Sequence, residues 1–445
     1  MRFRTLQVRL RQCAVPMSCA LGLAFGSATA MATPPPPPPP APPVAGTLSP
    51  AATLGRALFG DAALSASGRQ SCASCHSPNN AFSAPNTSPT QFGGASLTLQ
   101  GLRNSPSILY ASLTPPFTLS TTPPPPGRPP RAVGGLMLDG RVATLAAQAQ
   151  LPFITSFEMG NASAAEVTQR LKQRPYLAQF TQLYGAAILN NPDATLQAMG
   201  QSIAAFETES VGFHPFTSKY DAYLVGQTSL TANEAAGLRL FTDPKKGNCA
   251  ACHSAAPVNG QPALFTDRSY HAIGVPRNWA IAYNNDNTLL PSFVPANGSN
   301  LGAPGHNYYD MGLCGPVRTD LANNTGLCGM FKVPSLRNVA VKQTYFHNGV
   351  FNNLPEVLAF YTTRNSNPAR WYKQANGSPD QLYNDLPKTY AQNVEPRGAN
   401  VSLIPSLSPA EIKQVISFMC TLTDGFDPKH PAAYSNPAQC QAANQ

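Results

Sequence analysis

A Cys-x-x-Cys-His pentad stands at residues 72–76 and again at residues 249–253. Two thiols three positions apart can each bond to a vinyl group of one porphyrin, and the adjoining histidine can face the iron, so the pattern is typical of c-type haem. A single pentad could instead be a zinc site or a dithiol redox pair. A zinc site is a remote interpretation when two pentads occur in a chain that carries an export signal, because exported thiols are usually oxidised or modified. We therefore predict two covalent haems, attached through Cys72, Cys75, Cys249 and Cys252 and ligated by His76 and His253.

The start of the chain has the features of a secretory signal. Arginines precede an apolar run from about Cys13 to Phe25, and Ala28-Thr29-Ala30 supplies the small residues of a cleavage site. The apolar run is too short to span a membrane stably. We predict a signal peptide over residues 1–30, a periplasmic protein and no transmembrane anchor after cleavage. An unbroken proline run predicts a stiff, extended linker over residues 31–46.

Composition favours a helical protein with long loops. The 445 residues are 42% hydrophobic and 11% charged, which is enough for two domains with cores of their own, and 46 prolines and 33 glycines indicate extensive loops. Part of the net charge of +9 lies in the leader, and nothing indicates binding to nucleic acid. We predict a mainly α fold with little β structure, built from two cytochrome c-like haem domains packed together. They span residues 47–222 and 223–430, with a tail over residues 431–445.

Caps and apolar spacing place the helices. Thr231 with Glu234, and Ser408 with Glu411, form capping boxes that open one helix before the second pentad and another near the end of the chain. A third box, at residues 163–166, predicts a helix that kinks near Pro175. Other positions share one helical face, namely Leu54 and Leu58 before the first pentad, and Leu196, Met199, Ile203 and Phe206 between the pentads.

Four cysteines remain once the leader and the pentads are set aside. They are Cys314, Cys328, Cys420 and Cys440, and they allow three pairings. We favour Cys314 with Cys328 and Cys420 with Cys440, because each of these pairs closes a short loop. The alternative is that some of the four stay free.

The segments on the C-terminal side of the two pentads differ. After His76 no histidine occurs before His214, and the nearest methionine is Met137, so the first iron has no evident second protein ligand. An open ferric haem that takes hydrogen peroxide needs a nearby acid–base group. Glu158 lies among apolar residues that would raise its pKa by desolvation and suit it to that role. The alternative is a structural carboxylate paired with Arg141 or another arginine.

The order and spacing of several motifs resemble those of the bacterial di-haem cytochrome c peroxidase and MauG family. The similarity covers most of residues 47 to 428. It is carried by both pentads and by residues 54–59, 103–106, 139–141, 158–159, 240–241, 271–276, 331–338 and 345–349, and by the terminal helix.

The resemblance implies roles for individual residues. Glu158 matches the family's distal acid–base glutamate, Gln148 its distal glutamine and Pro152 its distal-pocket proline. Members of the family also hold a calcium ion between the lobes, and carbonyl oxygens suit that cation whatever side chains they carry. The matching ligands here are the side chain of Asn104 and the backbone carbonyls of Lys342 and Thr344; without the family, Asn104 could equally be a turn or cap residue.

Three departures from the family pattern narrow the interpretation. Peroxidases that need reductive activation carry a histidine where this chain has residues 91–94, so we expect the peroxide site to be open in the fully ferric protein. Tyr361 stands where those peroxidases place a methionine on the second iron. MauG-like members also have a tyrosine at this position. An oxygen ligand there would lower the haem potential; the alternative is a core tyrosine with its hydroxyl paired elsewhere. Leu138 replaces the family's inter-haem tryptophan, which puts fast charge sharing between the haems in doubt.

We therefore predict a periplasmic di-haem peroxidase of the MauG-like branch. It would reduce hydrogen peroxide at the first haem and pass oxidising equivalents through the second to an electron-donor protein or a protein substrate. One alternative is a respiratory cytochrome c peroxidase that takes electrons from a small cytochrome c or cupredoxin. Another is a non-catalytic di-haem electron carrier. Partners are expected at the long loops 280–330 and 364–402, whose Trp279 and Trp371 either pack the fold or pass electrons.

Overall fold

The computed structural model describes residues 46–122, 124, 129–257, 262–286, 308–395, 404–434 and 437–443. The predicted signal peptide, and all of the predicted linker except Gly46, lie outside these residues. Within the described ranges, no helix is both long enough and apolar enough to cross a bilayer.

Helices of the first half pack around α6, the longest of them. Gly55 of α1 lets the two backbones approach closely, because any side chain there would meet the peptide of Ser202 in α6. The predicted apolar stripes of both helices are buried in one cluster, which confirms them. The helices of this half are α1 (Pro50–Gly60), α2 (Cys72–Cys75), α3 (Leu145–Ile154), α4 (Ala164–Leu171), α5 (Leu177–Tyr184) and α6 (Pro192–Glu209).

The helix expected to kink near Pro175 is instead two separate helices. Ser163 caps α4 by accepting a hydrogen bond from the Glu166 N–H, but the predicted capping box is not reciprocal, because the Glu166 carboxylate accepts from the Ala162 N–H instead. The helix α4 ends at Leu171, and α5 begins only at Leu177. Proline has no N–H to donate and its ring clashes with the preceding turn, so the chain stops the first helix before Pro175 rather than bending through it.

The second half is organised by α8 and α12. Both open with reciprocal capping boxes at Thr231 and Ser408, as predicted. Gly237 of α8 lies against the α12 backbone at Gln414, where a larger residue would clash. The helices of this half are α7 (Lys219–Leu224), α8 (Ala232–Thr242), α9 (Ala282–Asn285), α10 (Leu354–Thr363), α11 (Pro368–Trp371), α12 (Pro409–Cys420) and α13 (Ala438–Ala443).

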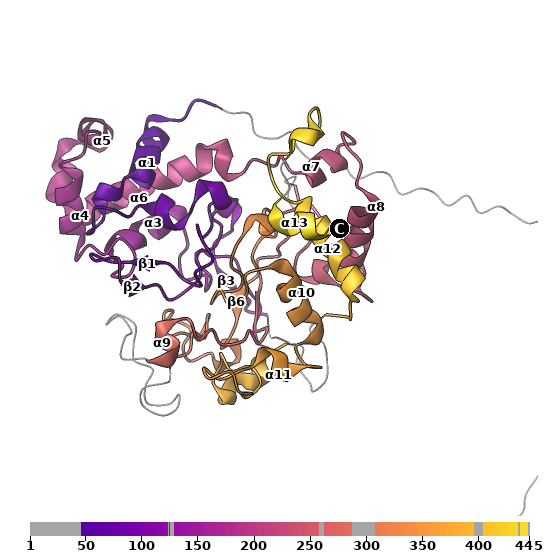
Figure 1. Cartoon of the computed structure of the whole chain (residues 1–445). Helices are drawn as coiled ribbons and strands as arrows, with labels where there is room; N and C mark the ends of the chain where they lie inside the picture. Colours follow the sequence, from indigo (N-terminus) through magenta and orange to yellow (C-terminus); the bar gives the residue numbers. More distant parts are fainter. Residues whose placement is uncertain are drawn as a thin grey trace, which may run out of the picture. The chain divides into compact units, whose positions relative to one another are not determined.

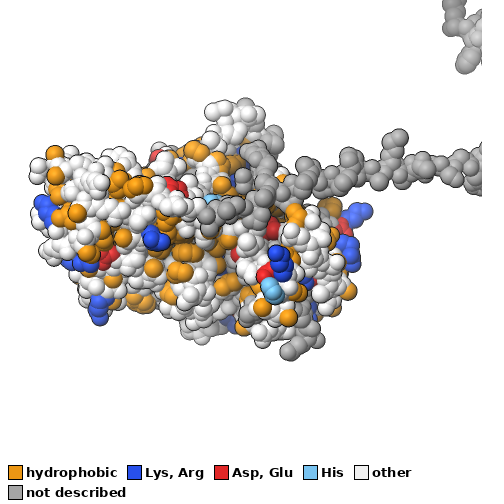
Figure 2. Space-filling view, turned by 90° about the horizontal axis from the view of Figure 1, so that it is seen from above, with side chains coloured by type: hydrophobic (Ala, Val, Ile, Leu, Met, Phe, Trp, Pro, Cys, Tyr) orange, Lys and Arg blue, Asp and Glu red, His pale blue; other side chains and the backbone are white. Residues whose placement is uncertain are grey.

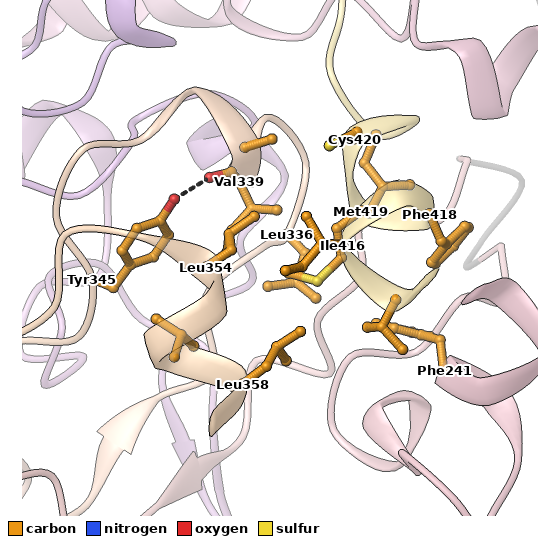
Figure 3. Close-up of a cluster of buried hydrophobic side chains, with 14 of the residues drawn as sticks. Phe241, Leu336, Val339, Tyr345, Leu354, Leu358, Ile416, Phe418, Met419 and Cys420 are labelled. Carbon is orange, nitrogen blue, oxygen red and sulfur yellow. Dashed lines mark hydrogen bonds between the residues drawn. The ribbon is translucent and has the colours of Figure 1, made fainter. Parts of the chain in front are cut away.

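Each half has its own hydrophobic cluster. Figure 1 shows α1, α3, α4, α5 and α6 in one part of the molecule and α8, α10, α12 and α13 in another. Figure 3 shows the second cluster, in which Phe241 of α8, Leu358 of α10 and Phe418 of α12 converge. The buried residues of the first cluster fall between Ala52 and Phe213, and those of the second between Tyr220 and Cys440. The lobe boundaries remain a prediction.

Strands are confined to three short antiparallel pairs within the described residues, which agrees with the predicted mainly α fold. In the first pair Phe92 lies opposite Gln100, in the second Thr118 lies opposite Val133, and in the third Tyr270 lies opposite Lys332. The strands are β1 (Phe92–Gly93) with β2 (Leu99–Gln100), β3 (Thr118–Leu119) with β4 (Ala132–Val133), and β5 (Tyr270–His271) with β6 (Phe331–Lys332).

Two disulfides cross-link segments of the second half, and they confirm the two pairings favoured from the sequence. Cys314 bonds to Cys328, and Cys420 bonds to Cys440. The second bond ties α13 to α12, so the last described helix belongs to the fold. Charged side chains are sparse on the face shown in Figure 2, as the 11% charged composition suggests.

Candidate functional site

Both pentads open onto one internal cavity of about 950 Å³. Its walls include both pentad histidines and Cys75, Cys249 and Cys252. The volume is near the top of the range of roughly 300–1,000 Å³ that is usual for the site of one drug-sized ligand. The cavity therefore connects the two predicted haem positions.

In the first pentad, the orientation of the imidazole is fixed by two carbonyls. The His76 Nδ1 lies 3.1 Å from the carbonyl oxygens of both Phe82 and Pro106. Carbonyl oxygens only accept, so Nδ1 must carry the proton and Nε2 must be the basic nitrogen. Burial lowers the pKa of His76, which keeps the ring neutral as a metal ligand must be.

The second pentad repeats this arrangement. His253 Nδ1 donates to the carbonyl oxygen of Phe265 at 2.9 Å, and burial again lowers the pKa of the ring. All four pentad thiols are free, whereas the other four cysteines of the described residues form disulfides. Free paired thiols beside a neutral, oriented imidazole fit the attachment of a c-type haem at each pentad.

Glu158 lies at the cavity without an arginine partner of its own among the described residues. The nearest candidate, Arg141, instead bonds both carboxylate oxygens of Asp139 at 2.8 and 2.9 Å. Burial raises the pKa of Glu158, although a hydrogen bond with Thr155 and the charge of Arg141 offset part of that rise. The structural alternative of a Glu158–Arg141 ion pair is therefore not what this geometry shows.

Gln148 and Pro152 line the same cavity from α3. The Gln148 side-chain nitrogen lies 4.0 Å from the Met137 sulfur, which also faces the cavity. Met137 has a left-handed backbone (φ 65°) at a tight turn, an unusual conformation for a residue other than glycine. Sequence reasoning identified Met137 only as the nearest methionine, and the structure adds that it belongs to the wall beside Gln148.

Tyr361 lines the cavity from α10, on the side of the second pentad. Burial raises the pKa of its phenol, and the neighbouring Cys252 and Cys249 thiols add to the effect. Within the described part of the chain, no hydrogen bond contributes to that shift, so the alternative of a hydroxyl paired elsewhere has no support. A bound ferric iron would instead lower the pKa of the phenol, because the positive metal favours the phenolate.

Comparisons with known proteins place this geometry in a family. Residues 49–229 match the family model described as di-haem cytochrome c peroxidase. The chain is 33% identical over 401 residues to methylamine utilization protein MauG of Paracoccus denitrificans (strain Pd 1222), which covers 86% of this chain and 92% of that protein. The chain belongs to the di-haem cytochrome c peroxidase and MauG family.

Other members agree in sequence and in fold. Cytochrome c551 peroxidase of Nitrosomonas europaea is 29% identical over 349 residues, which are 78% of this chain and 80% of that protein. The crystal structure of the di-haem peroxidase BthA from Burkholderia thailandensis E264 superposes with a TM-score of 0.71 at 32% identity, covering 89% of this chain and 92% of that one. The protein is thus an oxidoreductase of a di-haem peroxidase family, and two c-type haems are its cofactors.

Two of the predicted calcium ligands show no feature that favours a cation. The buried Asn104 atom without a hydrogen-bond partner among the described residues is the amide nitrogen, which is a hydrogen-bond donor and cannot ligate Ca²⁺. Ca²⁺ takes oxygen ligands, so the Asn104 amide oxygen and the backbone carbonyls would have to serve. The Lys342 carbonyl, however, already accepts hydrogen bonds from the Tyr345 hydroxyl and the Gln439 side chain, each at 3.0 Å. A cation held by Asn104, Lys342 and Thr344 would have to share or displace one of these bonds, and calcium stays a prediction.

Three ionisable side chains of the cavity wall were not found from the sequence. Burial raises the pKa of Glu207 to about 8 and lowers the pKa values of Lys332 and Lys342 to about 8. Glu207 lies four positions after Ile203 on the buried stripe of α6, so an acidic residue on an apolar face was an available signal. The two lysines lie in loop-rich segments whose sequence carries no such pattern.

Leu138 lies at the cavity, whereas the side chains of Trp279 and Trp371 contact other parts of the fold. Leu138 lines the cavity, where the family resemblance predicts a tryptophan. Trp371 is buried against Phe360 and donates to Thr363, and the Trp279 indole donates to the Lys373 carbonyl at 2.7 Å. These contacts suit a packing role for both indoles.

Proposed function

We propose that this protein is a periplasmic, exported peroxidase of the MauG-like branch. It would reduce hydrogen peroxide at the haem of the first pentad and deliver the oxidising equivalents, through the haem of the second, to an external electron donor or a protein substrate. The observation that carries the proposal is the contrast within one cavity. Among the described residues, the Glu158 carboxyl lines the first side without an ion pair to Arg141, which binds Asp139 instead, and the Tyr361 phenol lines the second side.

The first side would manage protons. Haem c, when bound, supplies a redox-active iron with a coordination position for peroxide. Glu158, as a carboxylate, would accept a proton from one peroxide oxygen and return it to the other, which leaves as water when the O–O bond breaks. Gln148 would orient the peroxide through its amide, and Pro152 would help to exclude water. His76 would hold the haem iron through Nε2, because its Nδ1–H is held by backbone carbonyls.

The second side would manage electrons. His253 and Tyr361 would both hold the iron of the second haem, which would leave that iron closed to peroxide. An anionic oxygen ligand favours oxidised iron and lowers the potential relative to methionine. Such a haem accepts electrons poorly from a high-potential donor cytochrome, which supports the MauG-like branch over a respiratory peroxidase.

The test is the reaction of hydrogen peroxide with the Glu158→Gln protein beside the parent, measured optically by stopped flow. General acid–base catalysis contributes roughly 10²- to 10⁴-fold, so we expect the second-order rate constant to fall by at least about 100-fold. Glu356→Gln, an exposed change in the first turn of α10, is the matched control and should leave the rate unchanged. An unaltered rate in Glu158→Gln would remove this residue from the proposed role.

A respiratory cytochrome c peroxidase is the second candidate, because the Nitrosomonas europaea relative is named cytochrome c551 peroxidase. Steady turnover of peroxide with reduced small cytochrome c or cupredoxin would favour it. A high-spin ferric signal in the isolated protein, with no methionine–iron band and slow turnover with those donors, would favour the MauG-like assignment.

A further inference from the structure

The turn that carries Glu158 is packed, backbone against backbone, on the β1–β2 hairpin. The Gly94 N–H donates to the Glu158 carbonyl oxygen at 2.8 Å. A Cβ atom added at Gly93 would lie 2.6 Å from that same oxygen and closer still to the carbonyl of Phe157. Contacts this close are open only to glycine, so the hairpin and the turn meet through peptide groups alone.

The fit is reciprocal. A Cβ atom added at Gly160, two residues after Glu158, would lie 2.8 Å from the Gly94 Cα. One added at Gly94 would lie 2.7 Å from the Ser156 carbonyl oxygen, and both glycines have left-handed backbones, with φ values of 83° and 69° for Gly94 and Gly160. Three glycines from two distant segments therefore form one seam around residues 156–160.

The hairpin is also tied to the first pentad. The Gln70 side-chain amide donates to the Phe92 carbonyl at 3.0 Å, and the same nitrogen lies 3.5 Å from the Cys75 sulfur. On the opposite side, the Ala66 N–H donates to the Met159 carbonyl at 2.8 Å. A short chain of contacts thus runs from the thiol that would anchor the first haem, through Gln70 and the hairpin, to the peptide of Glu158.

We propose that Gly93 and Gly94 are positioning residues of the peroxide site, which set the place of the Glu158 carboxyl relative to the first haem attachment. The inference rests on the proposed function of Glu158. A proton-transferring group must lie within hydrogen-bond reach of the atoms it serves, and a misplacement of about 1 Å can cost roughly 100-fold in rate. The close contacts of the glycine seam leave the peptide of Glu158 little room to shift, and so fix the point from which its side chain extends.

The test is Gly93→Ala, whose backbone conformation alanine can adopt, so that only the lost space is probed. We expect the peroxide rate constant to fall by about tenfold or more and the Gly94 amide to lose protection from hydrogen exchange. In the Glu158→Gln background, the same change should cost less than about twofold, because both substitutions act through one carboxyl. Gly60→Ala, with nothing within 4 Å of the added atom, is the control and should behave like the parent.

The outcomes separate the two proposals. A parent-like rate in Gly93→Ala, with Glu158→Gln slow, overturns the positioning role and leaves the role of Glu158 intact. Equal losses from Gly93→Ala in both backgrounds also overturn it, because the damage would then not pass through Glu158. If Gly93→Ala does not fold, Gln70→Leu decides. A threefold or larger loss that vanishes in the Glu158→Gln background supports the inference, and a parent-like rate overturns it.

Discussion

The two pentad regions share their anchoring chemistry and differ in the groups that lie across from it. In both, free thiols stand beside a buried imidazole whose Nδ1–H is held by backbone carbonyls. Across the cavity, the first region presents a carboxyl group and an amide from α3 and the turn after it, whereas the second presents the phenol of Tyr361 from α10. The two regions therefore share the residues that would attach a haem and differ in the residues that face it.

Replacing the phenol is expected to have the largest effect. Tyr361→Met should raise the midpoint potential of the second haem by a few hundred millivolts, within the ~0.8 V range that axial ligands span, because a thioether stabilises reduced iron and a phenolate oxidised iron. Spectroelectrochemical titration would measure it. Tyr372→Phe, at a buried phenol bonded to the Gly274 carbonyl, is the control. An unchanged potential in Tyr361→Met would show that this oxygen is not a ligand and would erase the contrast between the regions.

Substitution of a buried phenylalanine by alanine in each hydrophobic cluster tests whether the two regions are separate folding units. Phe418 of α12 is fully buried and packs against Phe241 with ring centroids 5.2 Å apart. Phe418→Ala should lower the free energy of unfolding by about 3–5 kcal/mol, as for other buried phenylalanines, and Phe180→Ala in the first cluster should do likewise. The Tyr110 hydroxyl donates to Asp424 at 2.6 Å and links the two halves, so we expect one calorimetric transition that both variants shift. Two transitions, each shifted by one variant, would show independent lobes.

The pH dependence of the peroxide reaction sharpens the comparison further. The proton-accepting form of Glu158 is the carboxylate, and burial raises its pKa. As pH falls through that raised pKa, the carboxyl becomes protonated, so the rate should decline by about tenfold per pH unit and should begin to decline above the usual glutamate value of about 4.3. Stopped-flow rates across pH would show this decline in the parent and a flat profile in Glu158→Gln. A decline of the same shape in both would assign it to another group.

Local signals in the sequence predicted much of the fold. The capping boxes at Thr231 and Ser408, the buried stripe of α6 and both disulfides could be read directly, because each depends on residues close together in the chain. An interruption near Pro175 was predicted correctly, but it was predicted as a kink within one helix and is a break between two helices. Whether a proline bends a helix or ends it depends on packing that the local sequence does not contain.

The site was predictable only in part, for the same reason. The pentads, Glu158, Gln148, Pro152 and Tyr361 all line one cavity, as the pattern and the family resemblance suggested. The pairing of Arg141 with Asp139 leaves Glu158 without that arginine as a partner, and it is a contact that spacing allowed but did not require. Lys332 reaches the cavity from the two-residue strand β6 and Lys342 from the end of a short 3-10 turn, and both elements are too short for periodicity to show which side chains turn inward.

Burial of the anchoring sulfurs has a consequence for how the protein is made. In the folded chain, burial raises the pKa values of Cys72 and Cys249 to about 12 and that of Cys75 to about 11, so these thiols stay protonated and poorly nucleophilic near neutral pH. Thioether bonds would form slowly inside such an interior. Haem attachment should therefore come before the polypeptide has finished folding.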